Sequence, residues 1–350
     1  MSCGPPLAGC CRLPSTQAEG VMAVVQIKHV EKVEASPEPT RGVLQLHGFN
    51  LACGSQLANG ELAWQSWGPH DAPVVIVLGG ISAGRDIGNW WSSQCGDGLA
   101  LDPAFLRLVS IDWIGGADAS SGPRNDREFS PIESSDQANA LLLLLNHLGI
   151  VQVEAVVGAS YGGCVAQHLA GLLGNRLKRL VVIGAAHRAS PWALALRTLQ
   201  RAGIESSTDR ASRVRALERA RQLAVLGYRT PTELESRFGE SDPATGVLGW
   251  LSAHGERFSA RFNASSFLCL SRSLDHHEFD PSRIKAKTTV VAIAEDLLVP
   301  LSLAREFVKR IGKHAELARI SSPYGHDAFL KESGEIACVL KYALAAELAA

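Results

Sequence analysis

Continuous runs of apolar residues recur along the chain, and each is followed by a polar or glycine-rich stretch. The runs occupy residues 73–78, 105–112, 155–159, 180–184 and 288–294, with a shorter one at 318–320. Runs of this length without polar alternation are typical of strands buried on both faces. Stretches with helical periodicity lie between them, for example residues 134–148. This alternation predicts an α/β fold, with a mostly parallel central sheet covered by helices on both faces.

Two regions depart from this rhythm. Residues 42–67 alternate apolar and polar positions with glycines between them, which is typical of antiparallel strands at a sheet edge. From residue 190 to 283 the strand-like runs stop, and arginine and glutamate recur at helical spacing. We therefore predict a poorly ordered arm over residues 1–41, a core formed by 42–189 and 284–350, and a helical lid inserted over 190–283.

Composition narrows the classes of function. Hydrophobic residues make up 46% of the 350 residues, and the formal net charge is only -1. This balance gives no electrostatic reason to expect binding to nucleic acid or to a membrane surface. No apolar run reaches the roughly 18 residues that a membrane span needs. The eight cysteines include no C-x-x-C pair, so we expect no metal site and no disulfide framework. A cytoplasmic protein without a signal peptide is the simplest expectation.

Residues 155–164 read as an apolar strand that runs through G-x-S-x-G into a helix. In that context the motif is typical of a nucleophile elbow. Gly158 and Gly162 would let the chain cross close to itself, and the turn would expose the Ser160 hydroxyl above the sheet. The alternative is a chance match in a glycine-rich chain. The strand before the motif and the helical pattern after it favour Ser160 as a catalytic nucleophile.

A serine nucleophile needs a base, and the base needs an orienting carboxylate. Asp296 follows a predicted strand, and His326 lies between the last predicted strand and the last predicted helix. Both fit the order Ser, Asp or Glu, His of an α/β-hydrolase sheet. His187 also follows a strand, but it precedes the carboxylate and so has the wrong order. His276 and His277 fall in the lid, where we expect a solvated or helix-capping role.

An acyl-transfer site of this kind also needs an oxyanion hole. In an α/β-hydrolase sheet it combines the backbone N–H after the nucleophile with one from the loop after an early strand. Here the first donor is Tyr161. The second is most simply Ile81, in the sequence Gly79-Gly80-Ile81.

Further motifs occur in order after the elbow. They are ARQLAVLGYRT at 220–230, GERF at 255–258, RFNA at 261–264 and GHDAFL at 325–330. With them the chain, over roughly residues 42–348, resembles the homoserine O-acyltransferases of the α/β-hydrolase superfamily. The resemblance implies the α/β-hydrolase fold, a triad of Ser160, Asp296 and His326, and a homodimer formed through the helical insertion.

The resemblance also implies a site for the amino-acid substrate. Arg221 would bind the carboxylate of that substrate, with Tyr228 and Asp327 helping to place it. Arginine suits this role because its planar fork pairs bidentately with a carboxylate. Asp327, next to the base, would receive the substrate ammonium group. Without the resemblance, Arg221 reads as part of a solvated helix face, because arginines crowd the stretch 210–221.

The chain departs from the usual family pattern near the expected acyl pocket. Tyr161 stands where the family usually has methionine, and residues 79–85 read GGISAGR instead of a His-Ala-Leu-Thr-Gly loop. Arg85 in this loop would favour a succinyl group, which carries a second carboxylate, over an acetyl group. A surface or helix-capping role is the alternative for Arg85.

These observations predict a homoserine O-succinyltransferase of methionine biosynthesis. It would pass succinyl from succinyl-CoA to the hydroxyl of L-homoserine through an acyl-enzyme on Ser160, with no metal and no cofactor beyond the acyl-CoA co-substrate. One alternative is acetyl-CoA as donor. Another is L-serine as acceptor, since one methylene discriminates by only about 1–3 kcal/mol. An esterase or thioesterase with the same triad and a non-catalytic binding protein are the remaining alternatives.

Overall fold

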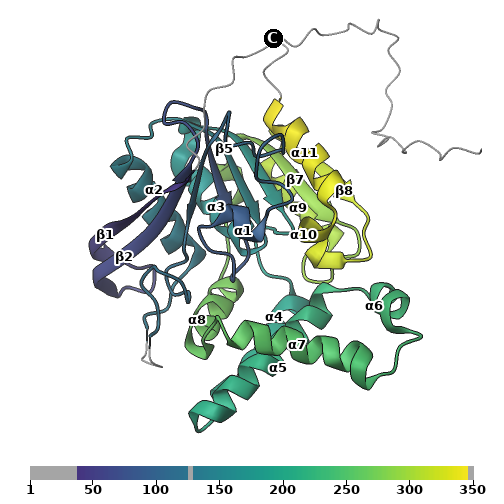
Figure 1. Cartoon of the computed structure of the whole chain (residues 1–350). Coiled ribbons are helices and arrows are strands. Elements are labelled where there is room, and N and C mark those ends of the chain that lie inside the picture. Colours follow the sequence, from purple (N-terminus) through teal and green to yellow (C-terminus); the bar gives the residue numbers. More distant parts are fainter. Residues whose placement is uncertain (1–37, 125–128, 346–350) are drawn as a thin grey trace, which may run out of the picture. The chain divides into compact units, whose positions relative to one another are not determined.

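The computed structural model of the protein describes residues 38–124 and 129–345. The arm predicted for residues 1–41 therefore falls almost entirely outside the described residues. The described residues form one eight-stranded sheet in the order β1-β2-β4-β3-β5-β6-β7-β8 (Figure 1). The strands are β1 (Thr40–Asn50), β2 (Gln56–Trp67), β3 (Val74–Leu78), β4 (Arg107–Ile111), β5 (Val153–Ala159), β6 (Leu177–Ile183), β7 (Lys287–Ile293) and β8 (Ala315–Ile320).

The sheet is mostly parallel, which confirms the predicted α/β-hydrolase class. Strand β1 pairs antiparallel with β2, and β2 pairs antiparallel with β4; every other neighbouring pair is parallel. All residues of β3 and β4 are buried, as their unbroken apolar runs predict. Strand β1 instead alternates exposed and partly buried positions, because it lies at the edge of the sheet.

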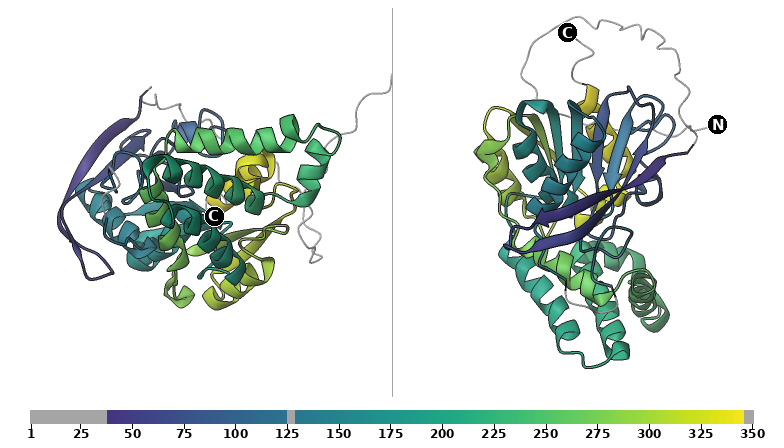
Figure 2. Two further views of the ribbon diagram at one scale, coloured as in Figure 1. Left: turned by 90° about the horizontal axis from the view of Figure 1, so that it is seen from below. Right: turned by 90° about the vertical axis from the view of Figure 1, so that its left-hand side faces the viewer.

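Side chains of alternate residues in β3 enter two separate cores. Ile76 joins a cluster with residues of α2 (Ser134–His147), α3 (Tyr161–Leu173) and α9 (Leu301–Ile311). Val75 and Val77 join a second cluster on the other face. That cluster includes residues of α1 (Ile87–Trp90) and α11 (Ser333–Ala345). The sheet is therefore the middle layer of three, as Figures 1 and 2 show.

The stretch between β6 and β7 is helical. It holds α4 (Pro191–Glu205), α5 (Arg210–Tyr228), α6 (Pro231–Phe238), a π-helical turn (Ala244–Leu248), α7 (Gly249–Ser259) and α8 (Ala264–Asp275). Four of these helices begin at a side-chain cap, provided by Ser190, Asp209, Thr230 and Asn263. In Figure 1 these helices lie together below the sheet, beyond the ends of its parallel strands.

Two short helices lie between β8 and α11, a 3-10 turn (Gly325–Asp327) and α10 (Ala328–Lys331), and further 3-10 turns precede β6 (Gly174–Arg176) and β7 (Pro281–Arg283). None of the described helices is long and apolar enough to cross a bilayer.

Candidate active site

Ser160 lies in a strained turn between β5 and α3. Its backbone φ is 53°, and it is the only non-glycine residue in the described ranges with a positive φ. Such a conformation persists only where the surrounding structure imposes it. A Cβ atom on Gly158 would lie 2.3 Å from the carbonyl oxygen of Gly162, and one on Gly162 would lie 2.3 Å from that of Leu78. Both positions of the motif therefore require glycine for Ser160 to be presented.

The structure brings Ser160, His326 and Asp296 into one hydrogen-bonded chain. His326 Nε2 lies 2.9 Å from Ser160 Oγ, and His326 Nδ1 lies 2.7 Å from Asp296 Oδ2. The other oxygen of Asp296 accepts backbone N–H bonds from Leu298 and Val299, at 2.8 and 3.1 Å. The three residues follow strands β5, β7 and β8. Because these strands are parallel, their carboxyl-terminal ends bring the three side chains to the same end of the sheet. This arrangement has the geometry of a nucleophile, a base and an orienting carboxylate.

The surroundings of His326 change its basicity. Burial by itself lowers the pKa of this imidazole, because it disfavours the charged form. The charge and hydrogen bond of Asp296, together with the charge of Asp327, act in the opposite direction. The net result is a pKa above the ordinary histidine value. His326 is therefore a stronger base than a free histidine side chain.

Two backbone N–H groups are available for an oxyanion beside Ser160. Within the described ranges, neither the amide of Ile81 nor that of Tyr161 has a hydrogen-bond acceptor. The loop that carries Ile81 is held in place by its neighbours. Gly162 N–H donates to the Gly79 carbonyl at 2.8 Å, and the Trp113 indole donates to the Gly80 carbonyl at 2.9 Å. Fixed donors of this kind stabilise charge that develops during acyl transfer.

The side chain of Tyr161 points into the protein core. Its ring meets Trp113 edge-on with ring centres 4.9 Å apart, and its hydroxyl lies 2.8 Å from Ser273 Oγ. The side chain is fully buried, and burial raises the pKa of the phenol. The expectation that this position borders the acyl pocket is therefore wrong for the side chain. Only the backbone of Tyr161 faces the site.

Ser160 and His326 open into a cavity of about 400 Å³ between the sheet edge and the lid. Arg221 also lines it, and its guanidinium carbon lies 5.0 Å from the ring centre of Phe258 and 5.7 Å from that of Tyr228. In the described part of the chain Arg221 has no ion-pair partner. Its charge is therefore held between two aromatic faces and remains available to an anion in the cavity.

Tyr228 and Asp327 line the same cavity as Arg221. The Tyr228 ring lies 5.6 Å from the ring of His326. Asp327 Oδ2 accepts a hydrogen bond from Arg229 Nε at 3.0 Å, and Arg229 is buried. Arg229, which orients Asp327, is not among the site residues predicted from the sequence. Its only signal in the sequence is its place in the motif ARQLAVLGYRT at 220–230.

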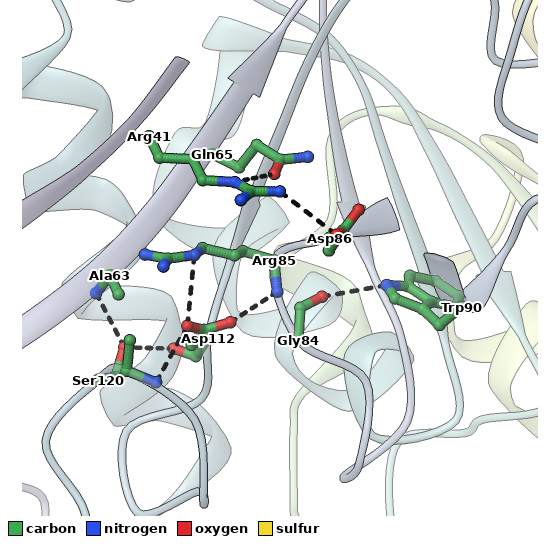
Figure 3. Close-up of polar contacts among 10 residues, drawn as sticks. Arg41, Ala63, Gln65, Gly84, Arg85, Asp86, Trp90, Asp112 and Ser120 are labelled. Atoms are coloured by element: carbon green, nitrogen blue, oxygen red, sulfur yellow. Dashed lines mark hydrogen bonds and ion pairs between the residues drawn. The ribbon is translucent and has the colours of Figure 1, made fainter. Parts of the chain in front are cut away.

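Figure 3 shows the surroundings of Arg85. The Arg85 backbone N–H donates to Asp112 Oδ1 at 2.7 Å, and Arg85 Nε lies 3.5 Å from Asp112 Oδ2. Ser82 and Ala83 line the cavity, but Arg85 is not among the lining residues. Its charge is already matched by Asp112, so its position does not support the predicted contact with an acyl carboxylate.

The histidines outside the triad have other partners. His187 is buried and its Nε2 lies 3.1 Å from Glu306. His276 ends helix α8, in line with the expected capping role. His277, however, is buried beside the cavity, and burial lowers its pKa to about 3. The expectation of a solvated or capping role is therefore wrong for His277. No cluster of potential metal ligands occurs among the residues that the structure covers.

The chain is similar in sequence to proteins of known families. A family model described as the alpha/beta hydrolase fold matches residues 73–333. A homoserine O-succinyltransferase of Xanthomonas campestris is 38% identical over 299 residues, which cover 81% of this chain and 79% of that protein. A homoserine O-acetyltransferase of Thermus thermophilus is 36% identical over 295 residues, which cover 78% of this chain and 76% of that protein.

Solved structures show the same fold. A homoserine O-acetyltransferase from Staphylococcus aureus superimposes with a TM-score of 0.76 at 24% identity, covering 87% of this chain and 95% of that one. An acetylester hydrolase from Corynebacterium glutamicum superimposes with a TM-score of 0.77 at 20% identity, covering 87% and 96%. At these identities the likeness concerns the fold alone, which transferases and hydrolases share.

Proposed function

The chain belongs to the α/β-hydrolase fold family and, within it, to the homoserine O-acyltransferases, and on this premise we propose that it transfers succinyl from succinyl-CoA to the hydroxyl of L-homoserine. The observation that carries the proposal is the hydrogen-bonded chain from Asp296 through His326 to Ser160, opening into a cavity that also holds the Arg221 guanidinium. A triad supplies acyl transfer, and the guanidinium supplies a site for an amino-acid carboxylate.

The first half-reaction forms the acyl-enzyme. Ser160 Oγ attacks the thioester carbon of the acyl-CoA while His326 Nε2 takes the hydroxyl proton. The amides of Ile81 and Tyr161 hold the negative charge on the thioester oxygen. The carbon–sulfur bond then breaks, and His326 returns the proton to the departing thiol of CoA. Asp296 keeps the imidazole oriented throughout and stabilises its charged form.

The second half-reaction moves the acyl group to the acceptor. Arg221 binds the carboxylate of homoserine, while Tyr228 and Asp327 help to place its ammonium group. His326 takes the proton of the homoserine hydroxyl, and that oxygen attacks the ester carbon on Ser160. The ester bond to Ser160 breaks, and the serine recovers its proton from His326. The scheme uses no metal or further cofactor, because Ser160, His326 and the two backbone amides supply the nucleophile, the base and the oxyanion donors. Cleavage of the thioester supplies the free energy for the transfer.

The second candidate is a hydrolase with the same triad, in which water replaces homoserine. The Arg221 site favours the transferase, since hydrolysis of a simple ester needs no receptor for an amino-acid carboxylate. Acetyl-CoA is the alternative donor, and the relatives include enzymes named for each acyl group.

The deciding experiment measures release of free CoA from succinyl-CoA and from acetyl-CoA, each with and without L-homoserine. We expect homoserine-dependent release that is faster from succinyl-CoA. L-serine, offered as a parallel acceptor, should support slower release. Release that is indifferent to both amino acids would identify a hydrolase.

The homodimer and the cytoplasmic location also remain proposals that come with the family. Helix α4 exposes large apolar side chains, including Trp192 and Leu199, and such side chains are suited to an interface between two copies. Sedimentation of the purified full chain at several concentrations measures the assembly directly.

A further inference from the structure

One wall of the cavity is polar and comes from two lid helices that face each other. Helix α4 contributes Arg197 and Gln200 to the lining, and helix α8 contributes Ser271. On α4, Arg201 follows Arg197 by one turn, so these side chains share a face. On α8, Asp275 follows Ser271 by one turn in the same way. Neither homoserine nor the triad, as described above, makes use of this wall.

The charges of this wall do not cancel. Arg197 Nε lies 2.5 Å from Asp275 Oδ1, and Arg201 Nη2 lies 2.5 Å from Asp275 Oδ2. The second terminal nitrogen of Arg201 donates to Ser271 Oγ at 2.9 Å. Two guanidiniums and one carboxylate leave one positive charge, and the three charged side chains are only 13%, 10% and 6% exposed. A buried charge without a counter-ion is costly, so this wall is suited to an anion.

The two terminal nitrogens of the Arg197 guanidinium can bind that anion. Among the residues that the structure describes, Asp275 is its only polar partner, and it takes the Nε–H. The two terminal nitrogens of a guanidinium form a fork that matches the two oxygens of a carboxylate. Arg201 lacks this freedom, because its terminal nitrogens already meet Asp275, Ser271 and Thr198.

The wall lies close to the nucleophile. Cys164 follows Ser160 by one helical turn, and both line the cavity with Arg197. Burial raises the pKa of the Cys164 thiol to about 12, and the charge of Arg197 is the main influence against that rise. The same charge also acts on His326. Arg197 therefore stands within electrostatic reach of the atoms around the acyl-enzyme.

Three other arginines near the cavity are less suited to a second carboxylate, and Arg261, which also lines it, lies near the opposite charge of Asp118. Arg85 is paired with Asp112, and Arg188 is paired with Glu306 at 3.2 Å. Arg221 lies between two aromatic rings, at the place proposed for the amino acid. We propose that Arg197, anchored by Asp275, binds the distal carboxylate of the acyl group on Ser160, and that this wall is the subsite that selects a dicarboxylic acyl donor. This inference rests on the proposed function, and it names the residue that would select succinyl-CoA as the acyl donor.

The test begins with the unmodified full chain and three donors. Succinyl-CoA carries the distal carboxylate, butyryl-CoA has the same number of acyl carbons without the charge, and acetyl-CoA is shorter. Homoserine-dependent release of CoA should be about 10- to 100-fold more efficient, in kcat/KM, with succinyl-CoA than with butyryl-CoA, as expected for charge-assisted hydrogen bonds. Equal efficiency with these two donors would overturn the subsite, whatever happens to any variant.

Two variants of Arg197 then test whether its guanidinium is the positive charge that binds the distal carboxylate. Arg197→Gln should lower the ratio of succinyl-CoA to acetyl-CoA efficiency by about 10- to 100-fold, and Arg197→Lys should restore part of it. Asp275 keeps Arg201 as its partner in both variants, which favours retention of the fold. Arg85→Gln is the matched comparison, because it removes the same charge from the other candidate, and it should leave the ratio unchanged.

The outcomes separate the two proposals. If Arg197→Gln slows both donors equally, Arg197 has a structural role and the subsite is wrong, while the transferase stands. If Arg85→Gln alone changes the ratio, the subsite lies at Arg85 in the loop after β3 and this assignment fails. If no donor shows dependence on homoserine, the proposed function fails. In that case hydrolysis of the three thioesters still decides the subsite by the same comparison of succinyl-CoA with butyryl-CoA.

Discussion

The sheet edge, by which we mean the carboxyl-terminal ends of the parallel strands, and the lid (residues 190–283) meet at the same cavity, yet they are built differently. Ser160, Asp296 and His326 follow parallel strands, so backbone hydrogen bonds fix where each loop begins. The side chains that face them across the cavity, such as Arg197 and Arg221, project from helices α4 and α5. Their positions depend on which helix face turns inward, and this depends on side-chain packing. The first region places the reacting groups, and the second region determines what they react with.

This difference gives a rule that mutations can test. A change at the sheet edge should slow the reaction with every donor and acceptor alike. A change in the lid should alter one substrate more than another.

Replacing Ser160 with alanine should lower kcat by roughly 10⁴-fold or more, because no acyl-enzyme can form. Intact mass spectrometry after mixing with succinyl-CoA should show a gain of one succinyl group in the unmodified protein and none in the variant. A thermal unfolding curve serves as the control for folding. Retention of substantial turnover by the variant would place the chemistry outside the elbow.

Asp296→Asn should lower kcat by about 10⁴-fold, because the imidazole loses both its orientation and the charge that stabilises its protonated form. The pH profile adds a second readout. His326 must be neutral to act as base, and its pKa is raised, so activity should already decline above pH 6.5 as the pH falls. The variant should move this acid limb to lower pH. A limb that stays in place would mean that another group titrates.

Arg221→Met, in the lid, should lower kcat/KM for homoserine by about 10- to 100-fold through loss of a charge-assisted hydrogen bond. Rapid-mixing measurements should still show an initial burst of CoA, because the first half-reaction does not need the amino acid. If the burst disappears together with turnover, Arg221 serves the donor or the fold, and the proposed division between sheet edge and lid is too simple.

Trp113→Phe tests a weaker contact behind the sheet edge. It removes the indole hydrogen bond to the Gly80 carbonyl, which is worth about 1 kcal/mol. We expect kcat to fall about fivefold for succinyl-CoA and acetyl-CoA alike, since the loop that carries Ile81 would be less well held. A change confined to one of the two donors would show that this residue also influences selection.

Much of the sheet edge could be predicted from the sequence. Strands such as β3 and β4 are buried on both faces, so their apolar runs are unbroken, and the order Ser160, Asp296, His326 follows from the topology. The lid could not be predicted in the same detail. Arginines crowd helix α5, and nothing local distinguishes Arg221, which lines the cavity, from Arg215 and Arg219, which are exposed.

The errors have a similar cause. Arg85 follows the loop that carries Ile81, but its partner Asp112 lies 27 residues away, and only the folded chain brings them together. Tyr161 follows the nucleophile, but the helical turn directs its side chain to Ser273 in the core. His277 lies in a polar stretch, yet it is enclosed by Ser134 and the Ala186 carbonyl. Sequence neighbours therefore predict where a backbone lies better than where a side chain points.

The end of α5 is tied to the loop that carries the base. Thr230 Oγ1 donates to the Pro323 carbonyl at 2.6 Å, and Arg229 holds Asp327 in the next turn. The groups proposed to bind homoserine are thus linked by hydrogen bonds to the loop that carries the base. Their mutual distances are settled when the chain folds, and the acceptor enters a site of high effective molarity. The entropy of aligning base and acceptor is then lost largely during folding, before homoserine arrives.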